Sequence, residues 1–426
     1  MRADTSLVAD LKARGLIYQS TDEQELEKHL ARPRTLYCGF DPTADSLHIG
    51  SLVPLLTLRR FQNAGHTPIA LVGGATGLIG DPSFKAQERQ LNDDSVVEGW
   101  TEKLRTQVGQ FLDLKNAKVV NNLDWIGGMT VVNFLRDIGK HFSVNAMMKK
   151  EAVKSRLERE DVGISFTEFS YALLQGLDFA ELYKEHNCTM QLGGSDQWGN
   201  ITAGVDLTRR LHETHVHAMT LPLVTKADGA KFGKTESGTI WLDGEKTSPY
   251  AFYQFWLNTA DADVEKFLKY FTFIPVTEIE AIASQHHEAP QERMGQMRLA
   301  EEVTRLVHGE EGVKQAQHLT SVVFSSDTDK WQRLSETDFQ QLRQDGLPAT
   351  ELGEREVPIL TALSTAGLAQ SNRQAREFID AGAVKVNGQP VPPKDYHHTL
   401  QPETALYNKF TVVQVGKKKT HLMYWS

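Results

Sequence analysis

Cysteine is scarce in this chain of 426 residues, which contains only Cys38 and Cys188. Two thiols so far apart in sequence exclude a disulfide framework and a zinc knuckle. This usage is typical of a reducing compartment. We therefore expect both thiols to be free and the protein to be cytoplasmic.

Long hydrophobic runs are also missing. The longest weakly apolar run, residues 68–80, is too short and too rich in glycine to cross a bilayer. The first residues lack the charged and then apolar pattern of an export signal. We expect no contact with a membrane.

The common nucleotide-binding and metal-binding motifs are absent. The glycines of G-G-A-T-G-L-I-G at residues 73–80 lack the G-x-G-x-x-G spacing, and no G-x-x-x-x-G-K-S/T occurs in the sequence. The H-E-T-H stretch at residues 212–215 lacks the H-E-x-x-H spacing of a zinc site, so we interpret it as a solvated loop. We expect no dinucleotide site, no P-loop and no metal held by the protein alone.

Negative charge predominates overall, but not at the C-terminal end. The net charge is −9, whereas residues 371–426 contain six Lys and two Arg against two Asp and two Glu. A basic surface attracts a phosphate backbone, although it is also common on proteins that bind no nucleic acid. Charge alone leaves RNA binding and simple solubilisation both open.

Strand and helix patterns alternate through the first half of the chain. Buried-strand patterns are separated by helical patterns at residues 52–63 and 95–112. This alternation predicts right-handed crossovers and a mostly parallel sheet, with ligands bound beyond the carboxyl ends of the strands. The predicted strands are 35–40, 68–72, 117–120, 189–192 and 219–224.

The length and the 40% apolar content allow two or three domains. Helical spacing continues from residue 248 to about residue 323, and polar residues then accumulate to about residue 356. Beyond them we expect a helix at 371–379, a helix end at Gly382, and a hairpin at Asn387-Gly388. The predicted division is a catalytic domain at 1–247, a helical domain at 248–325, a linker at 326–357 and a small α+β domain at 358–426.

The first strand runs into an unusual turn, C-G-F-D-P-T-A-D-S-L-H-I-G-S-L, at residues 38–52. The helix that we expect to begin near Gly50 or Ser51 offers unpaired N–H groups and a positive dipole end, which together accept phosphate. Thr43 and His48 can aim further donors at phosphate oxygens. The alternative is an Asp-Pro turn with one surface histidine.

A second loop favours the phosphate site over the plain Asp-Pro turn. K-F-G-K-T at residues 231–235 carries two lysines that can close over a polyphosphate, although lone lysine pairs are usually solvated. The H-I-G turn after the first strand and the K-x-x-K-T loop after the last one resemble the H-I-G-H and K-M-S-K-S signatures of class I aminoacyl-tRNA synthetases.

One predicted helix, residues 167–182, carries a polar stripe. Tyr171, Gln175 and Asp178 fall at i, i+4 and i+7, so they share one face. Such a stripe is often only the wet face of an amphipathic helix. However, Tyr37 lies within the buried first strand, and a substrate phenol needs both an acceptor and a donor, which Asp178 and Tyr37 can supply.

The whole set closely resembles the bacterial tyrosyl-tRNA synthetases over nearly the full chain, including L-V-G-G-A-T-G at 71–77 and G-G-S-D-Q-W-G-N at 193–200. The resemblance implies a Rossmann-like catalytic domain, then a helical domain and a small RNA-binding domain. It implies activation of L-tyrosine with ATP and Mg²⁺ and transfer of tyrosine to tRNA(Tyr). It also implies a homodimer formed around residues 130–160, and no DNA partner.

The resemblance further assigns roles to matching residues. It places tyrosine's hydroxyl on Tyr37 and Asp178, and its ammonium on Asp81, Tyr171 and Gln175. It implies that the ribose and the middle of the site are lined by Gly39, Asp41, Gly194, Asp196 and Gln197. The phosphates fall to Thr43, His48, Lys85, Arg89, Lys231 and Lys234, with Gly50, Ser51 and Thr235 also in the ATP site. The tRNA contacts are Arg373, Arg376, Lys385, Lys417, Lys418 and Lys419.

One departure from the family pattern is Ser51, which stands where a second histidine is common. It can still cap the helix, so we expect altered ATP affinity and not inactivity. Two rivals stay open: a tryptophan-activating relative and an RNA-binding paralogue without catalysis. Asp178 and Tyr37 disfavour the first, and His48, Lys231 and Lys234 disfavour the second.

Overall fold

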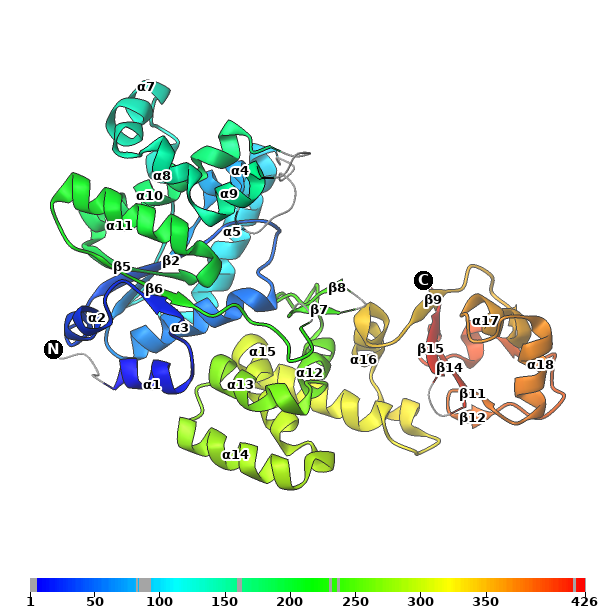
Figure 1. The fold of residues 1–426 in the computed structure, drawn as a ribbon. Helices are drawn as coiled ribbons and strands as arrows, with labels where there is room; N and C mark the ends of the chain where they lie inside the picture. Colours follow the sequence, from blue (N-terminus) through cyan, green and yellow to red (C-terminus); the bar gives the residue numbers. More distant parts are fainter. Residues whose placement is uncertain are drawn as a thin grey trace. The chain divides into compact units, whose positions relative to one another are not determined.

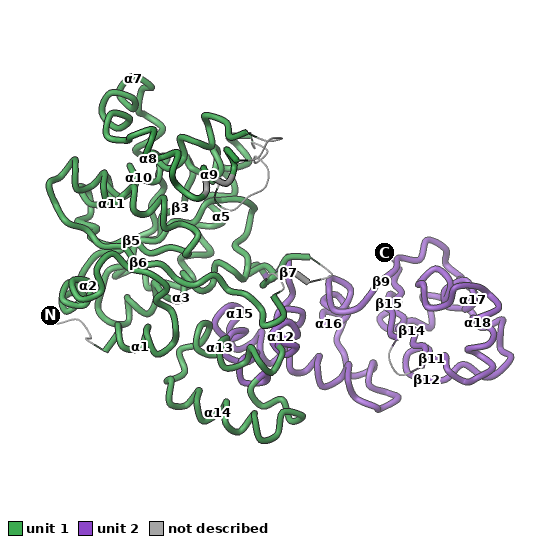
Figure 2. The backbone as a smooth tube through the Cα atoms, viewed as in Figure 1, with its two compact units in different colours: residues 1–243, 260–295 green, residues 244–259, 296–426 purple. Residues whose placement is uncertain are grey.

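The computed structural model describes residues 6–81, 83, 93–158, 163–229, 232–235, 238–416 and 419–425 (Figure 1). The chain forms two compact units, one of residues 1–243 and 260–295 and one of residues 244–259 and 296–426 (Figure 2). Among the described residues, no helix is long and apolar enough to cross a membrane.

The first unit is built on a six-stranded sheet in the order β1-β6-β5-β2-β3-β4. Every neighbouring pair is parallel except β1 with β6, so the predicted mostly parallel sheet is confirmed. Strand β6 ends at Leu221, three residues before the predicted end, because Pro222 has no N–H to donate to a ladder. The strands are β1 (Gln19–Ser20), β2 (Thr35–Phe40), β3 (Thr67–Val72), β4 (Lys118–Asn121), β5 (Cys188–Gly194) and β6 (His217–Leu221).

Helices cover both faces of this sheet. Helices α10 and α11 lie on one side and α3 lies on the other (Figure 1). A cluster of buried side chains, including Tyr37, Ile69 and Phe179, joins the sheet to α10. The longer helices of the unit are α1 (Leu7–Ala13), α2 (Glu23–Leu30), α3 (Leu52–Asn63), α5 (Asp94–Phe111), α10 (Phe166–His186), α11 (Trp198–His212), α13 (Asp261–Phe271) and α14 (Val276–Glu288).

Two buried arginines attach helix α13 to the body of the first unit. Arg14 donates from Nη2 to the carbonyl oxygen of Ile274 at 2.7 Å, and Arg60 donates to the carbonyl oxygen of Thr272. Burial lowers the pKa of Arg60 to about 9. The carbonyls that follow a helix carry the negative end of its dipole, so guanidinium groups stabilise this end.

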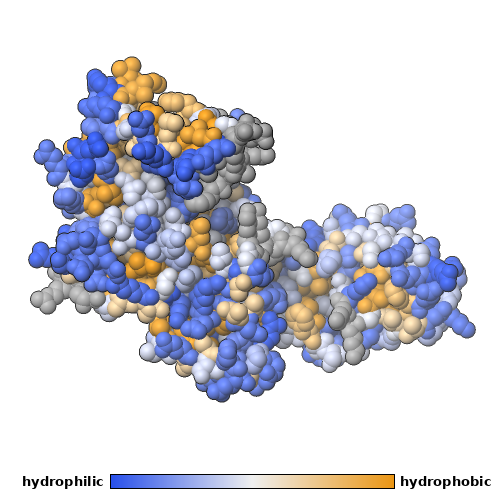
Figure 3. All heavy atoms as spheres, viewed as in Figure 1, coloured by the Kyte–Doolittle hydropathy of each residue, from blue (hydrophilic) through white to orange (hydrophobic). Residues whose placement is uncertain are grey.

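Large apolar side chains are exposed between residues 123 and 166 of the first unit. Figure 3 shows apolar residues gathered on the surface over α7 (Val131–Asn133). The short helices here are α6 (Leu123–Ile126), α7, α8 (Val144–Met148) and α9 (Glu151–Leu157). The exposed apolar patch comprises Leu123, Val131, Val132, Leu135, Val144, Met148, Leu157 and Phe166.

The second unit combines helices with a five-stranded sheet in the order β12-β11-β14-β15-β9. The long helix α15 (Met294–Val323) is interrupted at Gly309, where φ is +73°. The other helices are α12 (Pro249–Leu257), α16 (Glu336–Gln341), α17 (Ile359–Thr365) and α18 (Asn372–Asp380). The sheet strands are β9 (Ala349–Glu351), β11 (Val384–Val386), β12 (Gln389–Pro390), β14 (Phe410–Val415) and β15 (Lys419–Tyr424).

Residues 326–357, whose polar composition predicts a linker, contribute to a core of the second unit. Trp331 and Phe339 are fully buried there, and they pack with Tyr250 on α12 and with Phe410 on β14. Apolar anchors spaced this widely leave no periodic signal in the sequence. The domain limits drawn from the sequence stay a prediction.

The predicted hairpin at Asn387-Gly388 is present. Asn387 and Gly388 both have positive φ, +50° and +86°, as a two-residue turn of type I′ requires. A Cβ on Gly388 would lie 1.8 Å from the carbonyl oxygen of Thr328, so only glycine fits against that backbone. The helix-ending Gly382 likewise has φ +63°.

Candidate active site

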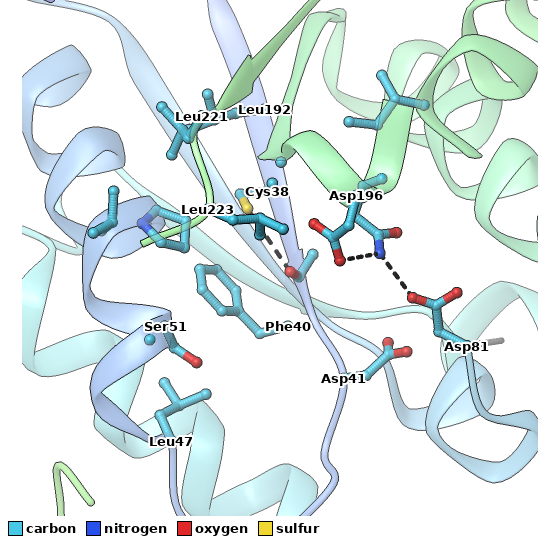
Figure 4. A pocket seen from close by; sticks show the side chains of 18 of the residues that line it. Cys38, Phe40, Asp41, Leu47, Ser51, Asp81, Leu192, Asp196, Leu221 and Leu223 are labelled. Carbon is cyan, nitrogen blue, oxygen red and sulfur yellow. Dashed lines mark hydrogen bonds between the residues drawn. The ribbon is translucent and has the colours of Figure 1, made fainter. Parts of the chain in front are cut away.

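A cleft of about 630 Å³ lies where the strands of the first unit end (Figure 4). The cleft is lined by the turn after β2, the start of α3, one face of α10 and the segment after β5. The carboxyl ends of parallel strands are where open α/β sheets bind their ligands. The predicted site residues that line it are Tyr37, Gly39, Asp41, Thr43, His48, Gly50, Ser51, Asp81, Tyr171, Gln175, Asp178, Gly194, Asp196 and Gln197.

Several other predicted residues cannot be placed in the cleft. Lys85, Arg89 and Lys231 lie outside the described residues. Lys234 and Thr235 form the short strand β7, which pairs with β8 (Gly238–Thr239), and the positions of their side chains are not described.

Tyr37 and Asp178 form the floor of the cleft, and both are buried. Within the described part of the chain, the Tyr37 hydroxyl has no hydrogen-bond partner. The Asp178 carboxylate accepts hydrogen bonds from Asn122 Nδ2 at 3.1 Å and from Trp125 Nε1 at 2.9 Å. Burial nevertheless raises the pKa of Asp178 to about 8, because the two donors only partly offset the loss of water.

The prediction from sequence missed Asn122 and Trp125. They follow β4, whose carboxyl end lies beside that of β3, so the fold brings them to the same edge of the sheet. The signal available in the sequence was the polar N-N-L-D-W run directly after a predicted strand. Their contact with a residue more than fifty positions later could not be read from spacing.

One chain of hydrogen bonds joins the floor to the opposite part of the cleft. Asn122 Nδ2 also donates to Thr76 Oγ1 at 3.0 Å, and Thr76 Oγ1 donates to Asp41 Oδ1 at 2.7 Å. The Tyr171 hydroxyl donates to Asp41 Oδ2 at 2.6 Å. A Cβ on Gly73 would lie 2.0 Å from Asp41 Oδ1, so glycine is required for this carboxylate to reach Thr76.

Carboxylates gather on the other side of the cleft. Gln197 Nε2 donates to Asp81 Oδ2 at 2.7 Å and to Asp196 Oδ2 at 3.1 Å, and Figure 4 shows the two aspartates on either side of that nitrogen. Burial, and then the neighbouring Asp81, raises the pKa of Asp196. With Asp41 nearby, this concentration of negative charge favours a cation such as an ammonium group.

His48 begins the turn that leads into α3. Its Nδ1 accepts a hydrogen bond from the Gly50 N–H at 3.0 Å and caps the 3₁₀ turn Ile49–Ser51. Although His48 is partly exposed to solvent, desolvation by its neighbours in the cleft lowers its pKa, so the ring is neutral and the proton lies on Nε2. Ser51 stands at the N-cap position of α3, which begins at Leu52, but the prediction that it caps the helix is wrong because its side chain makes no capping hydrogen bond.

The lysine loop is attached to this same turn. Ile240 donates its N–H to the Gly233 carbonyl at 3.1 Å, and Ile49 donates its N–H to the Ile240 carbonyl at 2.9 Å. Gly233 has φ +79°, and a Cβ there would lie 2.5 Å from Ile49. The Phe232 ring lies 5.1 Å from that of Phe267 and 5.3 Å from that of Phe271, both on α13.

Cys38 also lines the cleft. Both cysteines are free, as predicted, and both are buried. Burial raises the pKa of the Cys38 thiol to about 12, so the thiol is unreactive at neutral pH.

The basic residues predicted for RNA lie in the second unit. Arg373 is exposed at the start of α18, although it also donates to Glu377 at 3.1 Å. The Arg376 guanidinium lies 5.6 Å from the Tyr396 ring centre. Lys385 lies on β11 and Lys419 starts β15, whereas Lys417 and Lys418 lie outside the described residues.

Two family models match the chain. Residues 28–325 match the model described as "tRNA synthetases class I (W and Y)", and residues 338–423 match the model described as "Tyrosine--tRNA ligase SYY-like C-terminal domain". The tyrosine–tRNA ligase of Aliivibrio fischeri is 60% identical to this chain over 430 residues, which cover all of both proteins. That of Chromobacterium violaceum is 58% identical and covers 99% of each.

Solved structures resemble about three quarters of the chain. A C-terminally truncated mitochondrial tyrosyl-tRNA synthetase from Aspergillus nidulans has a TM-score of 0.67 and 31% identity, covering 74% of this chain and 93% of its own. The tyrosyl-tRNA synthetase of Archaeoglobus fulgidus, solved with L-tyrosine, has a TM-score of 0.54 and 15% identity, covering 73% and 99%. The second likeness is one of fold alone.

Proposed function

The chain belongs to the class I tRNA synthetases of the W and Y type and, within them, to the tyrosine–tRNA ligases, and from that premise we propose a role for each part of its cleft. The enzyme activates L-tyrosine with ATP to give tyrosyl-adenylate and pyrophosphate. It then transfers tyrosine to the 3′-terminal adenosine of tRNA(Tyr).

The tyrosine site is supported by one observation above the others: buried polar atoms around the cleft have no partner among the described residues. They are the Tyr37 hydroxyl, Gln175 Oε1 and Gln191 Oε1. Buried polar groups without partners are rare because each costs about 1–3 kcal/mol. A bound tyrosine supplies the missing groups, a phenol at Tyr37 and Asp178 and an ammonium at Gln175, Asp81 and Tyr171.

Selectivity follows from the same atoms. Phenylalanine would leave the Tyr37 hydroxyl and the Asp178 carboxylate without their partner. This enzyme class is itself the reference case for a hydroxyl-reading site, with rejection of phenylalanine by roughly 10⁵. Tryptophan, the substrate of the rival reading, would place an indole where the phenol hydroxyl is expected.

The ATP site occupies the turn after β2 and the segment after β5. In our proposal Gly39, Gly194 and Asp196 lie against the nucleoside, with Gln197 between it and tyrosine. The phosphates face Thr43 and the Nε2–H of His48, with Gly50 and Ser51 lining the same part of the cleft. Lys85, Arg89, Lys231, Lys234 and Thr235 complete this part of the site.

Activation needs no protein nucleophile, because the tyrosine carboxylate attacks the α-phosphate and displaces pyrophosphate. Positioning and charge stabilisation then supply the catalysis. The neutral His48 ring can donate a hydrogen bond from its Nε2–H to a phosphate oxygen. The loop of Lys231 and Lys234, attached to the His48 turn through Ile240, brings positive charge to the departing pyrophosphate.

Mg²⁺ fits this site as a companion of the phosphates. Among the residues described, no three His, Cys, Asp or Glu side chains are grouped to hold a metal. Mg²⁺ commonly uses phosphate oxygens and water, with one or two carboxylates. When bound, it neutralises charge that develops on the phosphates.

ATP–pyrophosphate exchange tests the proposal. Tyrosine should support exchange, whereas phenylalanine and tryptophan should not. Lys234→Ala should slow adenylate formation at least tenfold, as a loss of transition-state charge pairing of about 1.4 kcal/mol or more, while tyrosine affinity barely changes. Exchange that depends on tryptophan, or no exchange at all, would favour one of the two rivals.

The basic residues of the second unit are proposed to contact tRNA: Arg373, Arg376, Lys385, Lys417, Lys418 and Lys419. Removing this whole region would uncover Trp331 and Phe339, so charge reversal is the cleaner test. Lys385→Glu should lower the rate of tRNA charging and leave pyrophosphate exchange unchanged. Equal charging by the variant and the parent would identify these residues as a solubilising surface.

We also propose a homodimer in the cytoplasm. The exposed apolar patch at residues 123–166 supports it, because soluble monomers rarely expose so many large apolar side chains together. A second copy of the chain would bury the same patch on both subunits, as two-fold symmetry requires.

A further inference from the structure

The segment that leads from β2 to His48 forms no helix or strand at residues 41–47. Its backbone therefore lacks the regular hydrogen bonds that fix most buried segments, and its polar groups need partners from elsewhere. Ser46 and Leu47, at the end of this segment, are buried, and both line the cleft. The partners of these two residues decide where the following histidine begins.

One side chain from α5 supplies those partners. Gln107 Oε1 accepts a hydrogen bond from the Leu47 N–H at 2.8 Å, and Gln107 Nε2 donates to Ser46 Oγ at 2.9 Å. The Leu47 carbonyl accepts from the Leu242 N–H at 2.9 Å. Both backbone groups of the residue before His48 are thus held, one of them by a side chain 60 positions away in the sequence.

The two contacts of Gln107 need both ends of an amide. The Leu47 N–H can only donate, so it needs the Oε1 acceptor. Ser46 Oγ already donates to the Leu47 carbonyl oxygen at 3.0 Å, so it takes a donor from Gln107. An apolar side chain of similar length, such as methionine, would leave both groups without this partner.

We propose that Gln107 is a positioning residue for adenylate formation and that it acts through His48. The inference rests on the proposed function, in which the His48 ring donates to a phosphate oxygen. Because His48 Nδ1 accepts from the Gly50 N–H at 3.0 Å, the other ring nitrogen is left for that contact. Gln107 is not among the described residues that line the cleft, so it fixes the Leu47 backbone without contacting the substrate itself.

The position of the His48 ring matters for the chemical step more than for tyrosine binding. A displacement of a catalytic group by about 1 Å can lower a rate on the order of a hundredfold. The proposed tyrosine site lies on other elements, because Tyr37 is in β2 and Asp178 is in α10. Loss of the Gln107 amide should therefore slow adenylate formation and leave tyrosine affinity nearly unchanged.

The experiment compares the full-length parent with Gln107→Met and with Gln110→Met, a matched control on the exposed side of the same helix. Rapid kinetics measures adenylate formation per active site at saturating ATP and tyrosine, and equilibrium dialysis measures tyrosine affinity. We expect Gln107→Met to be slower by about tenfold or more, with tyrosine affinity within about twofold of the parent. Gln110→Met should match the parent in both measurements.

A second comparison tests whether Gln107 acts through His48. In the His48→Ala background there is no ring to position, so adding Gln107→Met should slow adenylate formation by less than about threefold. Equal slowing with and without the ring would overturn the proposal. So would a Gln107→Met protein that forms adenylate at the parent rate, or one whose tyrosine affinity falls as much as its rate.

Hydrogen exchange tests the same contact without any activity. The Leu47 amide should exchange faster by about tenfold or more in Gln107→Met than in Gln110→Met, because its acceptor is gone. If the parent forms no adenylate, the proposed function fails, and faster exchange at Leu47 still supports the fixing of the His48 turn by Gln107. Equal exchange in the two variants would show that Gln107 does not hold this turn.

Discussion

Asp178→Asn should make the protein more stable at neutral pH while weakening its selectivity for tyrosine. The folded state raises the pKa of Asp178 from 3.8 to about 8, so it binds this proton more tightly than the unfolded chain does. Between about pH 4 and about pH 8 the unfolded chain releases this proton while the folded protein keeps it, so stability falls progressively as the pH rises across that range. Asparagine cannot ionise and avoids this loss.

The magnitude comes from two opposing effects. A pH of 7 is about three units above the pKa of Asp178 in the unfolded chain. The buried Asp178 therefore lowers the free energy of unfolding by about 4 kcal/mol at this pH. Against this, the carboxylate accepts from both Asn122 and Trp125, whereas an amide has one acceptor oxygen. One donor is then orphaned at a cost of about 1–3 kcal/mol. The variant should gain about 2 kcal/mol at pH 7 and lose stability near pH 4.

Denaturant unfolding of the parent and Asp178→Asn from about pH 3 to about pH 8 checks this slope. Asp206→Asn is a matched control with the opposite sign. Bonds from Arg209 and Arg210 outweigh partial burial and lower the pKa of Asp206, so its contribution is present at neutral pH and fades in acid. A stability difference for Asp178→Asn that does not change with pH would refute the reasoning.

The same variant tests the phenol site. Without the carboxylate, tyrosine loses its acceptor while phenylalanine loses nothing. The ratio of tyrosine-dependent to phenylalanine-dependent pyrophosphate exchange should fall by about tenfold or more, the effect of losing one hydrogen bond in a buried site. An unchanged ratio would show that Asp178 does not read the hydroxyl.

Three further changes test other parts of the molecule. Phe232→Ala, which removes the contact with α13, should slow adenylate formation by about tenfold in rapid kinetics through loss of loop positioning, with Phe232→Leu closer to the parent and tyrosine affinity unchanged. Leu135→Asp in the exposed apolar patch should give monomers by light scattering, whereas the equally exposed Leu114→Asp outside it should not. Burial lowers the pKa of His29 to about 3, so stability falls as the pH drops from about 6.5, and His29→Gln should flatten that loss in acid titrations.

The elements of the first unit could be predicted because their signals are local. Strand β2 and helix α3 begin and end where the apolar spacing predicts, at Thr35–Phe40 and Leu52–Asn63. Asn387-Gly388 predicts its turn because both residues tolerate positive φ. Such features depend on a few neighbouring residues, so they can be predicted from a short stretch of the sequence.

The contacts that shape the cleft depend instead on residues far apart in the chain. Trp125 and Asn122 reach Asp178 only because β4 lies beside β3 and α10 crosses the sheet above them. The cap at the start of α3 was misassigned for a related reason. Ser51 has the right residue type for a cap, but backbone bonds of Leu47 with Leu242 and of Ile49 with Ile240 fix a 3₁₀ turn before α3, and His48 caps that turn.

Several features of the cleft are unfavourable in a folded protein, and all of them are of a kind that a bound ligand can relieve. Asp178 is buried with a raised pKa, the Tyr37 hydroxyl and Gln175 Oε1 lack partners in the described structure, and three aspartates stand close together. Each feature lowers the stability of the empty protein. Each would be relieved by a ligand that carries a phenol at one end and an ammonium at the other. Local strain of several kinds that one small molecule can remove is better explained by selection for binding than by tolerance of poor packing.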